Sequence, residues 1–377
     1  MKIIFIGGRD VRILGGIENY MLNLATQLVR LGHEPIVCCE SDHNATETIC
    51  GFEVRFIKGP KSNLICKPWV GLKATLRAVF RDKDVDLIHY NAWPPSLWCW
   101  IARLKGIPSL MEGHGLEWQR SKYGKTARRI MKFMEGLTAQ LNRNLVMCSE
   151  DQVRYFKETY GRDSVCIPGA VNMPAPDAGS RSDILNRFSL TPGRYFLFMG
   201  RLVQDKNPDC LIRAFLAGAP AAAPAAASPL AGFKLVIAGD NAAMPDYVEY
   251  LHGITDNPDV VFTGAVYGSD KAALLRNAFA FCLPSTMEGL SIVLMEAVSY
   301  RLPVIASDIP ANRELLRDNA IYVRPENEDD ICAALSTAIE NPDFSTFTAG
   351  NFKRLEAGYT WEKVARKYMD HVSKLKR

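Results

Sequence analysis

Long apolar runs, paired cysteine motifs and a secretory leader are all missing from this 377-residue sequence. No apolar run approaches the roughly 20 residues that a membrane-spanning helix needs. Residues 1–8 are apolar but lack the long hydrophobic stretch and the small-residue cleavage site of a signal peptide, so they predict a buried strand. The ten cysteines show no C-x-x-C spacing and mostly lie in apolar runs, which favours buried thiols over metal ligands. These absences predict a protein of the reducing cytoplasm.

Composition is that of a globular protein, with 48% hydrophobic and 23% charged residues. The length suits two domains that each bury a core. Charge is divided unevenly: Lys and Arg number 26 against 19 Asp and Glu in residues 1–187, and 19 against 22 in the remainder. The first half is therefore the basic one.

Apolar strand-like runs alternate with amphipathic helical stretches along the whole chain, which predicts an α/β protein with parallel sheets covered by helices on both faces. The strands expected in the first half are 2–6, 34–38, 87–90, 109–112 and 145–148. Those expected in the second half are 195–199, 234–238, 260–262, 278–283, 303–306 and 320–323. A first helix is indicated by Ile17, Tyr20, Met21, Leu24, Leu28 and Leu31, and Gly32 ends it. The pattern predicts two doubly wound, Rossmann-like domains.

The domain boundary is expected where Pro, Gly and small residues concentrate, at 168–181. We assign 1–170 to the first domain and 182–360 to the second. Ligand sites in such folds collect at the carboxyl ends of the strands, so the expected active site is a cleft where two such domains face one another. Residues 218–232 repeat Ala and Pro, which predicts a surface loop without a chemical role.

Two glutamates eight positions apart, Glu288 and Glu296, follow the expected strand 278–283. The Pro284-Ser285 turn and Gly289 lead from that strand into an apolar helix, so Glu288 is expected near a helix N-terminus. On one regular helix the two carboxylates would be roughly 12 Å apart. An isolated pair at this spacing is usually a solvated face, but this segment is apolar almost all round, and a carboxylate there needs a partner. The spacing suits an elongated ligand such as a nucleotide sugar.

Two cations follow the expected strand 195–199, namely Arg201 after Gly200, and Lys206. Arginine holds phosphate oxygens bidentately, lysine supplies a point charge, and the helix expected after Asn207 adds its partial positive charge. By themselves they are more typical of two surface cations beside a turn. Together with the glutamate pair, they predict a clamp for a diphosphate.

Gly15 and Gly16 precede the first helix, where backbone amides can approach an anion. Their spacing from the earlier glycines is not G-x-G-x-x-G, which argues against a dinucleotide oxidoreductase. His114 follows the expected strand 109–112. A lone histidine is more often structural, but the end of a strand is where a sugar-binding group would lie.

Five segments together resemble the retaining glycosyltransferases of family four, which have the GT-B fold of two Rossmann domains. They occur in the family's order and at family-like separations, and the resemblance runs nearly end to end. The segments are Gly15-Gly16-Ile17-Glu18, His114-Gly115, Gly200-Arg201-Leu202 with Lys206-Asn207, Ala238-Gly239-Asp240, and 284–297 with the strand 303–308 that follows.

The resemblance implies a role for each matching residue. His114 would hydrogen-bond the transferred sugar, and Glu288 would contact the same sugar with help from the amides of Gly289, Leu290 and Ser291. Glu296 would accept hydrogen bonds from the ribose hydroxyls. Gly15, Gly16, Gly200 and Gly239 would line the donor site, and Arg201 and Lys206 would hold the diphosphate. It also implies that the last helix, within 361–377, packs back on the first domain.

The clamp would stabilise negative charge on the leaving diphosphate and so replace a metal ion. We therefore expect no metal and no cofactor. Asp-x-Asp pairs, which hold a divalent ion in many other glycosyltransferases, occur among Asp82, Asp84 and Asp86. They precede the expected strand 87–90, so we interpret them as a solvated turn. Retention can arise by double displacement or by front-side attack, and we favour the second because no further carboxylate is evidently placed beneath the sugar.

The expected partners are a nucleotide-diphosphate sugar and a saccharide acceptor, with a lipid-linked acceptor favoured and no nucleic acid. Cations crowd the segment after His114, interleaved with apolar residues, as on a surface for anionic headgroups or on an ordinary solvated helix. The cations are Arg120, Lys122, Lys125, Arg128, Arg129 and Lys132, and the apolar residues are Tyr123, Ile130, Met131 and Phe133. Trp93, Trp98 and Trp100 fit core packing better than interface anchoring. We predict peripheral binding to the cytoplasmic membrane face.

Three alternatives stay open. A hydrolase or phosphorylase of the same fold would share the diphosphate and sugar contacts, and so would a nucleotide-sugar epimerase. A two-domain sugar-binding protein would have the same cleft without turnover. The absence of an export signal counts against the last.

Overall fold

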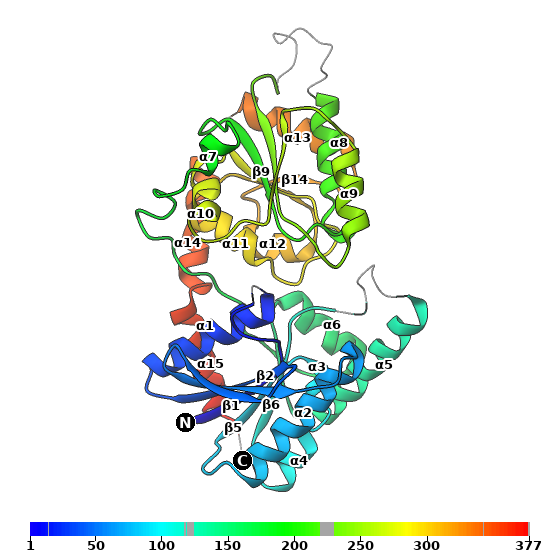
Figure 1. The fold of residues 1–377 in the computed structure, drawn as a ribbon, viewed down its shortest axis with the longest axis vertical. Helices are drawn as coiled ribbons and strands as arrows, with labels where there is room; N and C mark the ends of the chain where they lie inside the picture. Colours follow the sequence, from blue (N-terminus) through cyan, green and yellow to red (C-terminus); the bar gives the residue numbers. More distant parts are fainter. Residues whose placement is uncertain (14, 117, 119–123, 219–229, 342, 376–377) are drawn as a thin grey trace. The chain divides into compact units, whose positions relative to one another are not determined.

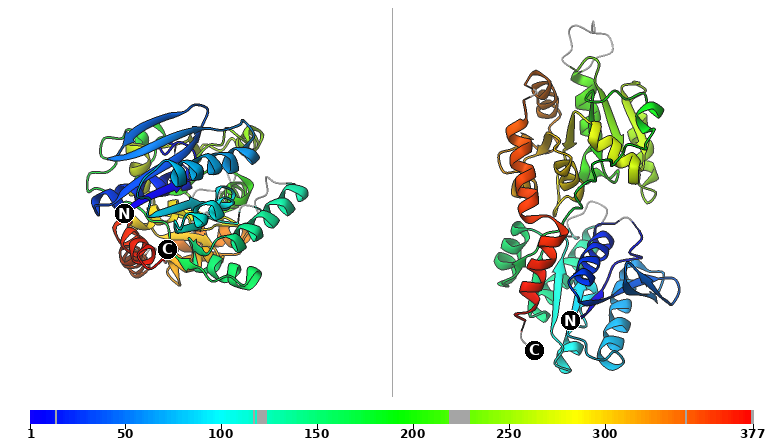
Figure 2. Two further views of the ribbon diagram at one scale, coloured as in Figure 1. Left: turned by 90° about the horizontal axis from the view of Figure 1, so that it is seen from below. Right: turned by 90° about the vertical axis from the view of Figure 1, so that its left-hand side faces the viewer.

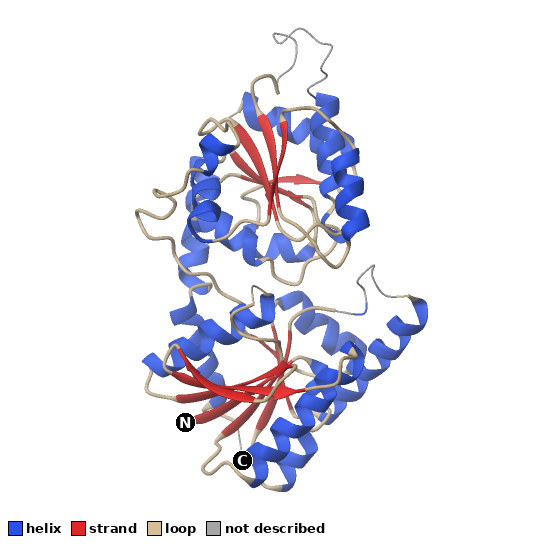
Figure 3. Ribbon diagram, viewed as in Figure 1, coloured by secondary structure: helices blue, strands red, loops and turns tan. Residues whose placement is uncertain are grey.

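The computed structural model describes the chain except residues 14, 117, 119–123, 219–229, 342 and 376–377, and the side chains of 63 and 64. Two compact units are present, and the second is inserted near the end of the first. Unit 1 comprises Met1–Ala170 and Tyr359–Arg377, and unit 2 comprises Val171–Gly358. In each unit, helices cover both faces of the sheet (Figure 3). Most of the Ala and Pro loop expected at 218–232 lies outside the described residues.

In the described part of unit 1, eight strands form one sheet in the order β3-β4-β2-β1-β5-β6-β7-β8. The bounds are β1 Lys2–Ile6, β2 Glu34–Ser41, β3 Ala45–Ile49, β4 Phe52–Lys58, β5 Leu87–Asn91, β6 Ser109–Gly113, β7 Asn144–Met147 and β8 Val165–Cys166. The expected strands of the first half are therefore present, within a few residues at their ends.

The prediction of a wholly parallel sheet is wrong at one edge of unit 1. Strands β3 and β4 are antiparallel and form a hairpin in which Ile49 pairs with Phe52. Cys50 and Gly51 turn the chain with φ of 49° and 85°, as a tight hairpin turn requires. Neither strand was expected, because β3 is polar and half-exposed and the charged side chains in β4 interrupt its apolar run.

Helices cover both faces of the unit 1 sheet. The bounds are α1 Gly16–Arg30, α2 Asn63–Phe80, α3 Trp93–Ser96, α4 Cys99–Leu104, α5 Lys125–Leu141, α6 Glu150–Tyr160 and α15 Trp361–Val372. Helices α1 and α15 share one core with the sheet, and α2 and α4 share another on its opposite face. The last helix, α15, lies beside α1 (Figures 1 and 2), with Trp361 against Tyr20 of α1 and Tyr368 against the sheet.

Within the described residues of unit 2, six parallel strands form the order β11-β10-β9-β12-β13-β14. The strands are β9 Tyr195–Met199, β10 Lys234–Ala238, β11 Val260–Gly264, β12 Ala280–Leu283, β13 Val304–Ser307 and β14 Ile321–Val323. The helices are α7 Ile184–Arg187, α8 Pro208–Gly218, α9 Pro245–Gly253, α10 Gly268–Asn277, α11 Ile292–Ser299, α12 Pro310–Leu316, α13 Glu328–Glu340 and α14 Ser345–Gly358, with a 3₁₀ turn at Gln204–Lys206.

In both sheets the direction in which successive strands are added reverses at one point. The candidate site lies at such a reversal point. In unit 1 the chain winds outward from β1 in one direction and then resumes at β5 on its other side. In unit 2 the same reversal lies between β9 and β12. In doubly wound sheets the loops at the carboxyl ends of two such strands diverge and leave a crevice for a ligand.

All ten cysteines lie in the described residues, none of them forms a disulfide bond, and seven are buried. This agrees with the expectation of buried thiols. Among the residues that the structure describes, we find no helix with both the length and the apolarity needed to cross a bilayer.

Candidate active site

The reversal point of unit 2 brings together the loop after β9 and the loop after β12. Three hydrogen bonds to backbone carbonyls join them: the amide and the hydroxyl of Thr286 donate to the Asp205 carbonyl at 2.9 and 3.2 Å, and Asn207 Nδ2 donates to the Pro284 carbonyl at 3.0 Å. Asn207 is buried in the left-handed region at φ 49°, where asparagine is tolerated better than most residues. These contacts hold the 3₁₀ turn, and with it Lys206, against the loop that carries Glu288.

Lys206 forms an ion pair with Glu288 at this point, and Ser285 Oγ donates to the same carboxylate oxygen at 2.8 Å. The side chain of Glu288 is only 8% exposed and that of Lys206 is 18% exposed, so the pair is largely withdrawn from water. The expectation that this carboxylate has a partner is confirmed. Glu288 also lies near a helix N-terminus, as expected, but in the loop before α11, which begins at Ile292, so one helix does not carry both glutamates.

Glu296 lies on α11 itself and accepts a hydrogen bond from Lys271 Nζ at 2.6 Å. Lys271 belongs to α10 and was not expected, since a lysine on an amphipathic helix carries no signal of its own. Ser291 begins α11 as its N-cap, where its hydroxyl accepts from the Leu294 amide at 3.4 Å. Gly289 and Leu290 lie in the loop between Glu288 and this cap.

The remaining predicted residues of unit 2 lie where β9 and β10 end side by side. A Cβ atom on Gly239 would lie 1.9 Å from the Gly200 carbonyl oxygen, so only glycine permits this approach of two loops. The Gly200 amide donates to the Ala238 carbonyl at 3.0 Å. Arg201 follows at an exposed position beside the reversal point. The structure therefore groups Gly200, Arg201, Lys206, Gly239 and Glu288 at the carboxyl edge of one sheet.

In unit 1, Gly15 is the N-cap of α1 and Gly16 is its first residue. Glu18 folds back over this start and accepts from the Arg9 amide at 3.0 Å. A Cβ atom on Gly15 would lie 2.0 Å from Glu18 Oε2, whereas one on Gly16 would meet nothing within 4 Å. The position of the Glu18 side chain is therefore enough to explain a glycine at position 15. The role of Gly15 and Gly16 in binding a ligand stays a prediction.

His114 follows the end of β6, and its side chain is 16% exposed. Its Nδ1 lies 3.8 Å from Glu112 Oε1, and its ring meets Tyr20 edge-on with centroids 5.0 Å apart. Glu112 Oε2 in turn lies 3.0 Å from Nε2 of His89, on the neighbouring strand β5. His89 Nδ1 is hydrogen-bonded to the Tyr368 hydroxyl of α15 at 2.9 Å. A fully buried polar cluster therefore underlies His114.

Burial sets the ionisation of this cluster. It raises the pKa of Glu112 to about 7, since a carboxylate there loses hydration, with His114 and Tyr20 acting in the opposite direction. It lowers the pKa of His89 to about 3 for the same reason. Both groups are therefore neutral at pH 5 to 6. Glu112 and His89 were not predicted from the sequence. Their positions inside the expected buried strands 109–112 and 87–90 could have indicated a buried polar cluster.

The raised pKa of Glu112 predicts a change of stability with pH. The folded protein keeps this proton between the ordinary carboxyl pKa of 4.5 and about 7, where the unfolded chain releases it, so Glu112 destabilises the fold progressively as pH rises through that window. Glu112→Gln should therefore gain roughly 3 kcal/mol relative to the wild type between pH 4.5 and 8. Calorimetric unfolding at several pH values measures this.

The matched control for that measurement is Glu362→Gln, on an exposed carboxylate of α15. Its difference from the wild type should stay nearly constant across the same pH range. A difference between wild type and Glu112→Gln that does not change with pH would contradict the assignment.

The acidic turn before β5 is confirmed as a turn but only partly as a solvated one. Asp82 is 12% exposed and accepts two hydrogen bonds from the buried Arg55, while Asp86 accepts from the Lys2 amide at 2.9 Å. Asp84 turns the chain with φ 56°. The described residues contain no group of three or more His, Cys, Asp or Glu side chains placed to hold a metal ion.

Of the basic segment after His114, Arg120, Lys122 and Tyr123 lie outside the described residues. The other four cations lie on α5, where Ile130 and Phe133 are exposed and Met131 is buried. Among the tryptophans, Trp98 donates to the Pro68 carbonyl at 2.7 Å and Trp93 packs against a small core, as expected, whereas Trp100 is 44% exposed.

Two family descriptions match the chain in its two halves. "Glycosyltransferase Family 4" matches residues 14–173, and "Glycosyl transferases group 1" matches residues 193–341. The D-inositol 3-phosphate glycosyltransferase of Rhodococcus erythropolis is 26% identical, with 93% of this chain and 84% of that protein aligned. The phosphatidyl-myo-inositol mannosyltransferase of Mycobacterium tuberculosis is 25% identical over 98% of this chain and 96% of that protein.

Solved structures agree on the architecture. The sucrose-phosphate synthase of Thermosynechococcus elongatus superposes with a TM-score of 0.82 at 18% sequence identity, covering 99% of this chain and 98% of the other. The chain therefore belongs to the family-four glycosyltransferases and has their GT-B fold of two Rossmann-like domains.

Proposed function

We propose that this glycosyltransferase is a retaining, metal-independent enzyme that moves a sugar from a nucleotide-diphosphate sugar to a lipid-linked saccharide. The observation that carries the donor part is the Lys206, Glu288 and Ser285 constellation at the reversal point of unit 2. It joins a cation and a carboxylate, both largely withdrawn from water, at the place where doubly wound sheets bind nucleotides.

Lys206 and Arg201 supply the positive charge that a diphosphate needs. Because Lys206 is only 18% exposed, its attraction for a phosphate is screened less than that of a surface lysine. Donor binding exchanges the Glu288 carboxylate for phosphate oxygens as the partner of Lys206, and frees Glu288 for the hydroxyls of the sugar. When the glycosidic bond breaks, the same cations stabilise the charge on the leaving diphosphate, which is the role of the metal in other enzymes.

Glu296 fits the ribose-binding role because a carboxylate accepts hydrogen bonds from two adjacent hydroxyls. Lys271 holds it in place at 2.6 Å. The first turn of α11, which Ser291 caps, has backbone amides without a partner inside the helix, and these are available to an anion. His114 belongs to unit 1, and its contact with the transferred sugar is part of the proposal.

The proposed step is front-side attack. The acceptor hydroxyl forms the new bond to the anomeric carbon as the bond to the diphosphate breaks on the same face, and the leaving phosphate oxygen takes the hydroxyl proton. Double displacement would need a free carboxylate nucleophile. With the donor bound, the Glu288 carboxylate is taken up by the sugar hydroxyls and by Ser285, and we assign no further carboxylate to the position beneath the sugar.

The acceptor part is supported by two observations. The mycobacterial relative is named for transfer to phosphatidyl-myo-inositol, which is a lipid. Helix α5 also combines four cations with the exposed side chains of Ile130 and Phe133, as on helices that lie at a bilayer surface. We propose peripheral association with the cytoplasmic face of the membrane and a part in the synthesis of a surface polysaccharide or glycolipid.

Thermal shift with a panel of nucleotides tests the donor proposal whichever base the donor carries. One of UDP, GDP, ADP and dTDP at 100 times its Kd should raise the midpoint of unit 2 by roughly 5–10 °C, because the ligand binds only the folded state. The matching nucleotide sugar should then release nucleotide diphosphate chiefly when an acceptor is present. Release without acceptor would indicate a hydrolase, a new sugar nucleotide would indicate an epimerase, and binding without turnover would indicate a sugar-binding protein.

A further inference from the structure

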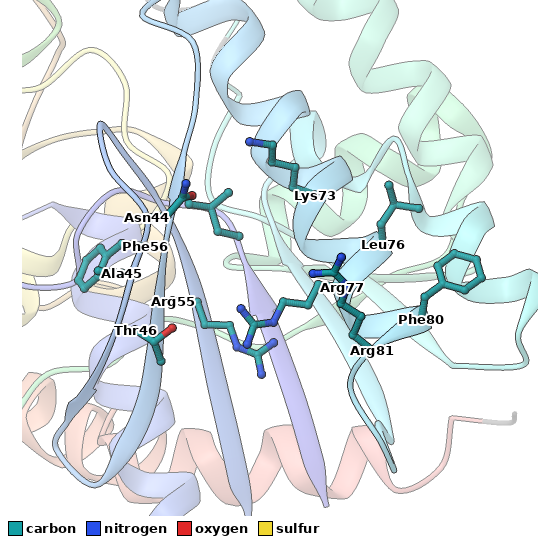
Figure 4. Close-up of a pocket in the computed structure, with 11 residues that line it drawn as sticks. Asn44, Ala45, Thr46, Arg55, Phe56, Lys73, Leu76, Arg77, Phe80 and Arg81 are labelled. Carbon is teal, nitrogen blue, oxygen red and sulfur yellow. The ribbon is translucent and has the colours of Figure 1, made fainter.

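A pocket of about 660 Å³ opens in unit 1 between the β3–β4 hairpin and α2. Figure 4 shows the residues that line it, among them Arg55 of β4, Lys73 and Arg77 of α2, and Arg81, which is the C-cap of α2. The pocket lies at the β3–β4 edge of the sheet, whereas the strand order reverses between β1 and β5. It is therefore separate from the region of His114.

The pocket carries more positive charge than its own carboxylates balance. Arg55 is paired with Asp82 and Glu53, and Arg77 approaches the same two acids at 3.8 and 3.9 Å. Lys73 Nζ donates to the Lys58 carbonyl at 3.2 Å, and no ion pair between described residues involves Lys73 or Arg81. Two carboxylates thus face four cations. Residues 54–81, which lie between these two acids in the sequence, contain seven Lys and Arg and no further Asp or Glu.

The pocket also opens beside an exposed apolar surface, which we call the α2 apolar stripe. Its members are Ile65, Trp69, Leu76 and Phe80, exposed by 58, 44, 39 and 62%. Spacings of four, seven and four residues place them along one face of α2. Leu76 and Phe80 line the pocket itself. Helix α4 packs against α2 and adds Trp100 and Leu104, the latter 75% exposed.

Cations flank this stripe closely. Lys73 Nζ lies 5.2 Å from the centre of the Trp69 ring, and Lys105 Nζ lies 5.4 Å from that of Phe80. A free phosphate ion would contact only the cations of this face. An acidic protein surface would pair with the cations but would leave the exposed aromatic and aliphatic side chains without an apolar partner. An anionic lipid surface supplies phosphate and hydrocarbon a few ångströms apart, which matches both halves of this face.

We propose that the pocket between β4 and α2 binds the phosphate headgroup of an anionic phospholipid, with the α2 apolar stripe inserted at the boundary of the acyl chains. Arg77 and Arg81 hold the phosphate, and Leu76 and Phe80 anchor the helix. This inference rests on the membrane association in the proposed function, but it places the principal contact on α2, in addition to the α5 surface suggested by the sequence.

Flotation of the full-length protein with vesicles tests the proposal. The wild type should bind phosphatidylglycerol–phosphatidylcholine vesicles and not vesicles of phosphatidylcholine alone. Arg77→Ala/Arg81→Ala should weaken binding about 10- to 30-fold, because each cation near the surface contributes about tenfold or less. Leu76→Ser/Phe80→Ser should weaken it about tenfold or more, with less dependence on salt.

Two matched controls separate this pocket from charge in general. Lys363→Ala/Lys367→Ala removes two exposed cations from α15, on the opposite face of the unit 1 sheet, and should change vesicle binding less than twofold. Arg128→Ala/Arg129→Ala removes two from α5, and should weaken binding less than the α2 variant does. Arg81→Gln alone keeps the test available if the double variant unfolds, because Arg81 has no ion pair among the described residues to lose.

The proposal would be overturned if the wild type did not float with the anionic vesicles, or if Arg77→Ala/Arg81→Ala bound them as tightly as the wild type. It would also be overturned if the α15 control lost as much vesicle binding as Arg77→Ala/Arg81→Ala, or if only the α5 variant lost binding. Binding of soluble glycerol 3-phosphate as tight as vesicle binding would also overturn it, since the lipid would then contribute nothing. Nucleotide-induced thermal shifts should stay unchanged in all these variants, so a failure of the donor proposal would appear there and not in flotation.

Discussion

Glu288→Gln should lower the rate of sugar transfer at least 100-fold while the nucleotide diphosphate still binds. The glutamine keeps the size of the side chain and its hydrogen bond with Ser285, so the loop after β12 keeps its form. What is lost is the negative charge that would bind the sugar hydroxyls and respond to positive charge developing at the anomeric carbon. Loss of one such group typically lowers kcat by 100- to 1,000-fold.

Glu288→Gln should also affect the affinity for the nucleotide diphosphate. In the wild type Lys206 is already paired with Glu288, and a diphosphate must compete with that carboxylate. Glu288→Gln removes the competitor, so the Kd for the nucleotide should stay the same or fall. Glu249→Gln, on an exposed glutamate of α9, is the matched control and should keep full activity. A fully active Glu288→Gln enzyme would remove Glu288 from the mechanism.

Lys206→Ala and Arg201→Ala should each weaken binding of the nucleotide diphosphate by about 10- to 100-fold, the typical effect of losing one charge-assisted contact to phosphate. Titration calorimetry with the diphosphate and with the nucleoside alone measures it, because the nucleoside should bind both variants and the wild type equally. Unchanged diphosphate affinity in both variants would refute the clamp.

Lys206→Ala has a second consequence that must be separated from the first. It leaves Glu288, which is 8% exposed, with Ser285 as its remaining hydrogen-bond donor among the described residues, and an uncompensated carboxylate costs about 1–3 kcal/mol of stability. The double variant Lys206→Ala/Glu288→Gln removes that carboxylate. It should regain thermal stability without regaining diphosphate affinity. Recovery of both would mean that the single variant had lost affinity through misfolding.

The elements that sequence reasoning located best are the buried parallel strands. Strands β9 and β10 match the expected residues 195–199 and 234–238 at both ends, because a strand covered on both faces is an unbroken apolar run. The β3–β4 hairpin was missed because an edge strand is half-solvated, and because β4 carries Arg55, whose burial depends on Asp82 far along the chain. Local composition does not encode that pairing.

In the candidate site too, some features could be predicted from local sequence and others depend on tertiary contacts. The residue types at Glu288, Lys206 and Arg201 and their places after strands could be predicted, because charged residues directly after buried strands are conspicuous. The idea that one helix carries both glutamates was wrong, since the loop after β12 continues to Ser291 before the backbone becomes helical. Lys271 and Glu112 were missed because their significance arises only from the side chains that surround them.

By itself, the order of apolar runs and turn residues determined that this chain forms two doubly wound sheets with charged residues at the strand ends, because strand formation and burial follow from local pattern. Only the tertiary structure decided which charges meet. Lys206 and Glu288 are 82 positions apart and touch because β12 pairs beside β9. His89 and Tyr368, 279 positions apart, meet because α15 packs against the sheet of unit 1. Strand order and helix packing create these contacts, and both depend on the whole fold.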